Sequence, residues 1–319
     1  MWNPVLLVSC TTPSAREWAL ESARAMAPTS REVRLRDVDA ASVQTIAGDV
    51  FGVVGAQKTS ADLLGSLASL RDTLALLTAW EETQSANVIV ECPRPAGAIV
   101  AEVTALRLLL EVAGSAPSAR ELAVRLAALE QAFDSGDIEW LVGCAPQPDA
   151  IDALTSQVAV AAGAGLRIRG VVIAPMPRES DGWPKVMRRA ARELTEHASN
   201  RLHPVPVKRA RAGVSPVFED PANEVVDVAT TQDHSGDRLF TMTVPGLGDG
   251  CDAVGTWSAD PAYPVTHVLV TIDGTTVRRA VDATLRRCEA IDAVLAGDTI
   301  TVTFIPFQGQ WPADESTEH

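Results

Sequence analysis

The stretch Val5-Leu-Leu-Val-Ser-Cys-Thr-Thr-Pro-Ser-Ala-Arg-Glu17 joins a short apolar run to a polar turn and then to an alanine-rich segment. The run predicts a buried strand, and the turn predicts the start of a helix. A strand, a turn and a helix in this order are the first unit of an alternating α/β fold. In such a fold, the turn after the first strand is the position that a phosphate-binding loop would occupy.

The same alternation continues through the first two thirds of the 319-residue chain. Short β-branched runs predict buried strands of a mostly parallel sheet, and long Ala- and Leu-rich segments predict the helices that flank it. The expected strands are Val5–Val8, Val33–Val38, Val88–Glu91, Ile138–Val142 and Ile168–Ile173. The expected helices are Ser14–Ala27, Thr59–Trp80, Ser118–Phe133, Ala150–Ala162 and Trp183–Ser199.

The period changes from helical to two in the last third of the chain. Leu239–Val244, Val265–Asp273 and Thr299–Phe304 alternate or run β-branched, with a turn at Asp273-Gly274. These segments predict a small antiparallel β-sandwich. The expected organisation is an α/β domain over residues 1–220, an acidic linker over 221–236, the β-sandwich over 237–307 and a disordered tail over 308–319.

Composition excludes several classes of function. The net charge of −14 and the isoelectric point near 4.8 argue against a nucleic-acid partner. No apolar run reaches the length of about 18 residues that a membrane-spanning helix needs. The cysteines form an odd set without a close pair, which indicates isolated thiols in a reducing cytoplasm. They are Cys10, Cys92, Cys144, Cys251 and Cys288.

The first turn lacks the chemistry of a phosphate-binding loop. Such a loop uses glycines, a lysine and a Ser or Thr hydroxyl, but the first glycine of this chain is Gly48 and the first lysine is Lys58. Pro13 removes an amide donor. Ser14 to Glu17 matches a capping box, as does the same tetrapeptide at Ser118 to Glu121, and a box here would consume helix amides that could face an anion. Thr11 and Thr12 keep hydroxyls, which are typical of solvated turns.

Three later segments carry a family resemblance. They are Asn87-Val-Ile-Val-Glu-Cys-Pro-Arg-Pro-Ala-Gly97, Arg169-Gly-Val-Val-Ile-Ala-Pro-Met-Pro177 with Trp183, and His203-Pro-Val-Pro-Val207. Together they resemble the ArsA-type anion-pump ATPases and their relatives that target tail-anchored proteins. The resemblance implies a P-loop NTPase-like fold, in which the first segment is the second switch and the other two surround adenine.

The C-terminal segments extend this resemblance. Phe240-Thr-Met-Thr-Val-Pro-Gly246, Thr271-Ile-Asp-Gly-Thr-Thr-Val-Arg-Arg279, Leu285-Arg-Arg-Cys288 and Asp298-Thr-Ile-Thr-Val-Thr-Phe304 look like the small-heat-shock-like sandwich of many bacterial members of the family. The resemblance covers most of the chain, and it implies a protein that dimerises across its nucleotide face.

The departures from the family pattern matter for activity. The glycine- and lysine-rich loop is missing, Glu91 and Ala96 replace an aspartate and a threonine of the switch, and the adenine-contacting asparagine falls near Ala174. The resemblance therefore implies a vestigial site without catalytic residues, metal or cofactor. Its phosphate-loop part is Cys10, Thr11, Thr12, Pro13 and Ser14, and its switch part is Glu91, Cys92, Pro95 and Gly97.

Several residues leave alternatives open. Lys58, with Thr59 or Ser60 as a helix cap, is a weak phosphate ligand, and Asp37 and Asp39 stand where a catalytic aspartate or a solvated strand end would lie. Cys10, at a strand end near a helix start, is either a reactive or a structural thiol. A basic group forms a solvated face or meets an acidic partner. Its members are Arg188, Arg189, Arg192, Arg201, Lys208, Arg209 and Arg211.

Three hypotheses follow for the function. The first is a pseudo-ATPase that serves as a binding or regulatory subunit, in a homodimer or in a heterodimer with an ATP-competent paralogue. The second is an active ATPase with a non-standard loop built from Thr11, Thr12, Lys58 and Glu91, which requires ATP and Mg. The third is a chaperone-like module that binds clients through the strand edges of the sandwich.

Overall fold

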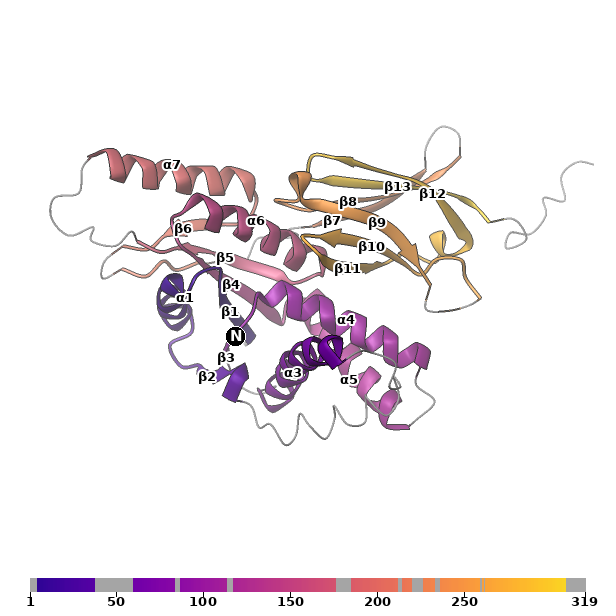
Figure 1. Ribbon diagram of the computed structural model, residues 1–319, viewed down its shortest axis with the longest axis horizontal. Coiled ribbons are helices and arrows are strands. Elements are labelled where there is room, and N and C mark those ends of the chain that lie inside the picture. Colours follow the sequence, from indigo (N-terminus) through magenta and orange to yellow (C-terminus); the bar gives the residue numbers. More distant parts are fainter. Residues whose placement is uncertain are drawn as a thin grey trace, which may run out of the picture.

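The chain folds into an α/β unit followed by an antiparallel β unit (Figure 1). The computed structural model describes residues 5–37, 60–83, 87–113, 117–175, 185–211, 214–219, 226–232, 236–258, 260 and 262–307.

Six parallel strands form the sheet of the α/β unit, in the order β2-β3-β1-β4-β5-β6. Strands in its centre are buried on both faces, which explains their continuous apolar runs. The predicted parallel sheet flanked by helices is therefore confirmed. Its elements are β1 (Val5–Cys10), α1 (Pro13–Met26), β2 (Arg31–Arg34), a 3₁₀ turn (Leu35–Asp37), α3 (Ser60–Thr83), β3 (Val88–Glu91), α4 (Ala96–Ala113), α5 (Pro117–Ser135), β4 (Ile138–Cys144), α6 (Pro148–Gly163), β5 (Arg167–Ile173), α7 (Lys185–Arg201) and β6 (Val207–Arg209).

The helices cover the two faces of the sheet unequally. On one face, Ala19, Leu20 and Ala23 of α1 pack against alternate residues of the strands. Helices α3 to α7 contribute to the larger core on the opposite face. Because strand-to-strand crossovers are right-handed, helices that lead in opposite directions from β1 must lie on opposite faces. The connections therefore diverge beside β1, and at such a point open α/β sheets place their ligand site, at the carboxyl ends of the strands. We call this position, at the ends of β1, β3 and β4, the crevice.

Helix α4 and strand β2 differ from the sequence-based expectation, and strand β6 was not among the expected strands. Helix α4 was not expected, because its apolar residues point to several sides and leave no clear helical period. Ile99, Val100, Val103 and Leu110 are all fully buried. The strand expected at Val33–Val38 is shorter and earlier: β2 ends at Arg34, and a 3₁₀ turn follows it.

The β unit is a sandwich of a four-stranded sheet, β12-β13-β8-β7, and a three-stranded sheet, β11-β10-β9. The expected Asp273-Gly274 turn closes the β10–β11 hairpin, with φ of 48° and 72° at these residues, as a two-residue hairpin requires. The predicted β-sandwich is confirmed. Its strands are β7 (Asp227–Gln232), β8 (Arg238–Thr243), β9 (Cys251–Trp257), β10 (His267–Ile272), β11 (Thr275–Ala280), β12 (Cys288–Ala296) and β13 (Thr299–Pro306).

The expected linker over 221–236 needs a correction, because it contains strand β7. This strand pairs antiparallel with β8 from Asp227 opposite Thr243 to Gln232 opposite Arg238. Its exposed, mostly polar side chains resemble a linker in the sequence, since an edge strand buries little of its surface. The expected tail over 308–319 lies outside the described residues.

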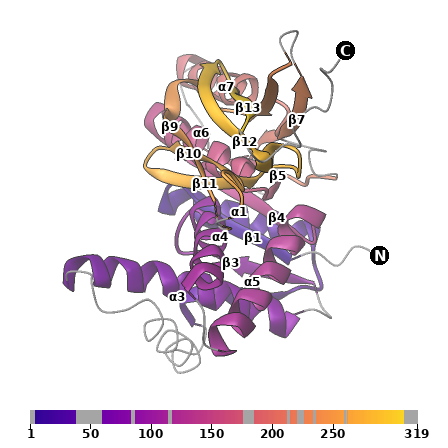
Figure 2. The same cartoon turned by 90° about the vertical axis from the view of Figure 1, so that its right-hand side faces the viewer.

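The two units share one hydrophobic core. Strands β10 and β11 pack against α6, and β11 also packs against α4 (Figures 1 and 2). The fully buried Val277 of β11 faces Gly163 at the end of α6, and a Cβ atom at Gly163 would lie 3.2 Å from Val277 Cγ2. Residues of both units belong to the same cluster of buried side chains. The sandwich is therefore docked on the α/β unit through apolar contacts.

Candidate functional site

The crevice brings together the two vestigial segments expected from the sequence. Val8 of β1 lies opposite Glu91 of β3, and Cys10 lies opposite Gly143 of β4. The amide of Thr11 donates to Gly143 O at 2.9 Å, and that of Cys92 donates to Val8 O at 2.8 Å. The first turn and the switch segment are therefore neighbours, in the place where open α/β sheets bind ligands.

Helix α1 begins two residues earlier than the capping-box prediction required. Pro13 occupies the first turn of the helix, and extended Thr12 is its N-cap residue, so the predicted Ser14 cap is wrong. Ser14 Oγ lies 3.4 Å from Thr12 Oγ1, and the Glu17 carboxylate pairs with Arg24 at 2.9 Å. Proline favours the first helical position because it has no amide to satisfy there, which moves the cap to the residue before it.

The same correction applies to the second predicted box. Helix α5 begins at Pro117, so Ser118 lies inside the helix.

In the first turn of α1, Pro13 supplies no amide and the amide of Ala15 donates to Thr12 O at 3.1 Å. The hydroxyl oxygen of Thr11 is buried rather than solvated. Two positions of this turn, Pro13 and Ala15, therefore offer no free amide to an anion, although the reason differs from the one expected.

Two arginines hold the carboxylate at the switch position. Arg16, in the first turn of α1, forms an ion pair with Glu91, and Arg34, at the end of β2, lies 3.3 Å from the other oxygen of Glu91. The side chain of Glu91 is 13% exposed. Hydrogen bonding to Glu91 raises the pKa of Arg16. A carboxylate that is neutralised in this way is a poor ligand for a divalent cation.

Neither arginine was identified from the sequence. Each had a signal, because Arg16 stands in the first turn of the helix after β1 and Arg34 ends the strand next to β3. Arg16 also places a positive charge in a turn for which the sequence suggested none. Its Nη2 is engaged by Glu91, while its buried Nε has no hydrogen-bond partner among the described residues.

The remaining switch residues have structural roles. Burial raises the pKa of the Cys92 thiol, and Pro95 O accepts a hydrogen bond from the Ala98 amide at 3.1 Å as α4 begins. Gly97 lies where α4 approaches α6, and a Cβ atom there would lie 2.6 Å from the backbone nitrogen of Ala161. These contacts explain the residues by packing and helix initiation, without a ligand.

The turn after β3 is fixed by an arginine that the sequence analysis left without a role. Arg94 pairs with Asp72 of α3 at 2.6 Å and with Glu102 of α4 at 2.9 Å. The position of this turn is therefore set by a charge network on the face of the sheet opposite α1.

Cys10 has the properties of a structural thiol. Burial raises its pKa, and the nearby charge of Arg16 lowers it in part. Burial also raises the pKa of Cys144, at the end of the neighbouring strand, to about 11. Both thiols are therefore protonated near neutral pH, and all five cysteines of the chain are free.

Other candidate residues do not reach the crevice or cannot be placed. Lys58, Thr59, Asp39 and Trp183 lie outside the described residues, as do the side chains of Ser60 and Arg188. Asp37 has a 63% exposed side chain near Arg36, as a solvated strand end would. Ala174 is buried at the end of β5, and its amide donates to Cys144 O at 2.8 Å.

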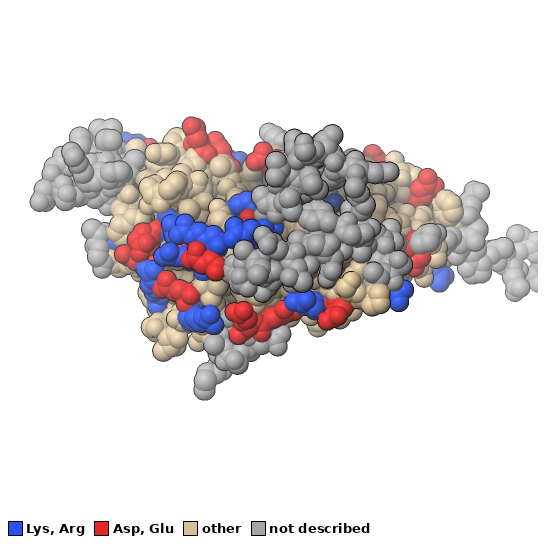
Figure 3. Space-filling model, turned by 60° about the horizontal axis from the view of Figure 1, so that its bottom comes forward, with Lys and Arg blue, Asp and Glu red and all other residues tan. Residues whose placement is uncertain are grey.

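The basic group is distributed over contacts with its own chain. Arg189 is 81% exposed and pairs with Glu193, and Arg201 pairs with Asp152 at 2.7 Å. Lys208 donates to Val217 O at 2.7 Å. On the face shown in Figure 3, basic and acidic side chains are interleaved rather than separated into patches of one sign.

Comparisons with known proteins identify no family for this chain. No protein-family model matches the sequence, and no curated protein matches it. Among the described residues, no group of three or more His, Cys, Asp or Glu side chains could hold a metal ion. Within the same part of the chain, every helix is too short or too polar to cross a membrane.

Proposed function

We propose that this chain is an ArsA-like pseudo-ATPase, a binding or regulatory subunit that retains the scaffold of an ATPase without its hydrolytic activity. One observation carries the proposal: Glu91, at the switch position, is held between Arg16 and Arg34. In an active site of this type, the corresponding carboxylate would act on the magnesium ion or the attacking water. Here its charge is already compensated by the protein.

The first turn supports the same conclusion. Phosphate-binding loops surround phosphates with backbone amides and add a lysine. In this turn Pro13 has no amide, and the amide of Ala15 is bonded to Thr12 O. A triphosphate placed here would lose much of its hydration and would have to displace the ion pair between Arg16 and Glu91.

A regulatory subunit needs a partner that supplies the activity. By its resemblance to the ArsA-type family, the chain would pair across its crevice face with a second copy or with an ATP-competent paralogue. The partner test is native mass spectrometry of the complex isolated from its source. A second chain with an intact phosphate loop would indicate the heterodimer, and two copies would indicate the homodimer.

The test of lost hydrolysis uses the full-length protein. At about 1 mM Mg-ATP, the upper end of ordinary KM values, we expect no saturable heat of binding and no phosphate release above that of Glu91→Gln. Micromolar binding with turnover would overturn the proposal. If Lys58→Ala and Glu91→Gln both abolished that turnover, the alternative of an active ATPase with a non-standard loop would replace it.

The edge of the sandwich favours a second candidate function, client binding. Strand β12 pairs with β13 on one side, and it exposes 53% of Ile291, 52% of Val294 and 37% of Leu295. An exposed apolar edge can accept an additional strand from another chain.

Client binding is tested by following the aggregation of heat-denatured citrate synthase. If the edge binds clients, the full-length protein suppresses aggregation, and Val294→Lys loses this effect. Val124→Lys is the matched control, because Val124 is 70% exposed on α5, away from the edge. Absence of suppression by the wild type, or equal suppression by both variants, would exclude this function.

A further inference from the structure

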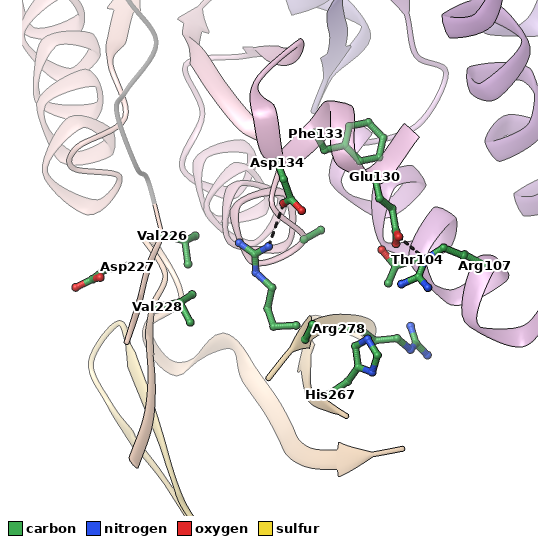
Figure 4. A pocket seen from close by; sticks show the side chains of 13 residues that line it. Thr104, Arg107, Glu130, Phe133, Asp134, Val226, Asp227, Val228, His267 and Arg278 are labelled. Atoms are coloured by element: carbon green, nitrogen blue, oxygen red, sulfur yellow. Dashed lines mark hydrogen bonds and ion pairs between the residues drawn. The ribbon is translucent and has the colours of Figure 1, made fainter. Parts of the chain in front are cut away.

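A cavity of about 500 Å³ lies where the sandwich meets the α/β unit (Figure 4). Its walls come from α4, α5 and the end of α6 on one side, and from β7, β10 and β11 on the other. The volume falls within the range of about 300 to 1,000 Å³ that is usual for small-molecule sites, which often form between domains. The crevice at the end of β1 contributes none of the residues that line it.

Three arginines point into this cavity from different elements. Arg107 comes from α4, and Arg278 and Arg279 come from β11. Arg107 pairs with Glu130 and Glu111, and Arg279 Nη1 lies 3.5 Å from Asp134 Oδ1 (Figure 4). The three guanidinium groups are therefore not equally compensated.

Arg278 is the guanidinium without an acidic partner. Within the described part of the chain, its contact is a 3.2 Å hydrogen bond from Nη1 to Thr276 O, and it forms no ion pair. Burial lowers its pKa, which indicates that its charge is poorly solvated. In addition, the buried Nε of Arg279 has no hydrogen-bond partner among the described residues.

The neighbouring histidine adds to this charge pattern. Figure 4 shows the head of Arg278 beside the His267 ring. Burial, together with the charges of Arg107, Arg286 and Arg278, lowers the pKa of His267 to about 4. His267 is therefore neutral at pH 7 and offers a hydrogen-bonding nitrogen rather than a further positive charge.

The carboxylates near the cavity pair with Arg107 and Arg279, which leaves Arg278 as the positive charge without an acidic partner among the described residues. Glu130 and Asp134 face the three arginines, while Asp227 turns away from them (Figure 4). Burial raises the pKa of Glu130, and its contacts with Thr104 and Arg107 lower it in part. The balance favours a ligand with one negative charge.

The rest of the lining is apolar. Phe133 contributes from α5, and Val226, just before β7, and Val228 of β7 turn towards the cavity (Figure 4). These two residues are called the β7 valines below. Ala164 and Ala280 complete this wall. A ligand that fills the site would therefore carry an apolar body beside its charged group.

We propose that the cavity between the two units binds a small organic anion that places one oxyanion group, a carboxylate or a phosphate, on Arg278 and its body against Phe133 and the β7 valines. A guanidinium presents paired N–H donors that match the two oxygens of either group. The proposed anion site does not depend on whether the protein hydrolyses ATP, because none of the residues that line it belongs to the crevice.

The test uses isothermal titration of the full-length protein with benzoate, phenyl phosphate, inorganic phosphate and neutral benzyl alcohol. We expect benzoate or phenyl phosphate to bind saturably at one site, and benzyl alcohol to show no saturation. The probe with the higher affinity identifies the oxyanion that the site prefers. Removing a charge-assisted bidentate contact with Arg278→Gln should weaken binding at least about tenfold. Arg189→Gln, which removes an exposed arginine from α7, should leave the affinity unchanged.

A second measurement covers the case in which Arg278→Gln fails to fold. Hydrogen exchange of the wild type with benzoate or phenyl phosphate should show protection concentrated at 104–107, 130–134 and 278–280. Arg278→Lys keeps the charge but loses the paired donors, so its affinity should fall between those of the wild type and the glutamine variant. The proposal is overturned if no oxyanion probe saturates, if protection lies elsewhere, or if the glutamine and Arg189→Gln variants bind equally.

Discussion

At the scale of single residues, Glu139 makes the stability of the protein depend on pH. Its side chain is 1% exposed on β4, and Arg169 Nε lies 3.5 Å from its carboxylate. Burial raises the pKa of Glu139 to about 7, although Arg169 and Arg167 lower it in part. A carboxyl group with a raised folded-state pKa stabilises the fold below its ordinary pKa of about 4.3, and this stabilisation is lost as pH rises through 7.

We therefore predict that Glu139 lowers the free energy of unfolding by on the order of 3 kcal/mol between pH 4 and pH 8. Urea denaturation of the wild type and of Glu139→Gln at both pH values measures this contribution, because other titrating groups affect both proteins alike. Relative to the wild type, the variant should gain about 3 kcal/mol of stability between pH 4 and pH 8. Identical pH profiles would show that Glu139 titrates normally.

The crevice shows what residue patterns alone could not reveal. The resemblance to the ArsA-type family implied that Glu91 and the turn at Cys10 to Ser14 belong to one site. Their ion-pair partners were not identified, because the contact of Arg34 with Glu91 depends on β2 lying next to β3, which is far from it along the chain. The predicted position of the α1 N-cap was also wrong, because Thr12 and Ser14 are both suitable N-cap residues and lie two positions apart.

At the scale of elements, the crossing of α4 and α6 depends on Gly97. A Cβ atom there would lie 2.6 to 2.9 Å from the backbone and Cβ of Ala161. We predict that Gly97→Val destabilises the protein by at least about 2 kcal/mol, because backbone atoms of α6 cannot move aside without separating the helices. Thermal or urea denaturation measures the change.

Gly255 of β9 provides the matched control for this substitution. It is exposed in a strand, and no atom lies within 4 Å of an added Cβ. Gly255→Val should change stability by less than about 0.5 kcal/mol. Equal effects at the two positions would mean that helix packing is not the reason for glycine at residue 97.

Element types were predicted well wherever one face of an element is buried. Strands β1 to β5 of the parallel sheet and helices α1, α3, α5, α6 and α7 have counterparts among the expected segments, whereas β6 has none. Helix α4 and strand β7 were missed for opposite reasons: α4 is buried on several sides, and β7 is exposed along most of its length. Periodicity cannot show either case, because it depends on a contrast between two faces. The cavity was missed with them, since both elements line it.

At the scale of the whole molecule, the shared core predicts that the two units unfold together. Val277 of the sandwich is fully buried against the end of α6. Val277→Ala should destabilise the protein by on the order of 2 kcal/mol, because it leaves a cavity in the common core. Differential scanning calorimetry should show one endotherm in the wild type, which shifts as a whole in the variant.

Val294→Ala is the control for the calorimetric experiment. Val294 is 52% exposed on β12, so its truncation should leave the endotherm almost unchanged. Two endotherms in the wild type, or a shift of only one of them in Val277→Ala, would show that the units unfold independently.

Helix α4 extends from the edge of the crevice to the cavity between the units. It begins at Ala96, five residues after Glu91, and carries Arg107 into the cavity about 16 Å further along its axis. A helix that is packed on several sides moves as a rigid body, so a displacement of one end also displaces the other end. A small molecule bound beside Arg107 would therefore displace, through helix α4, the turn that joins β3 to α4.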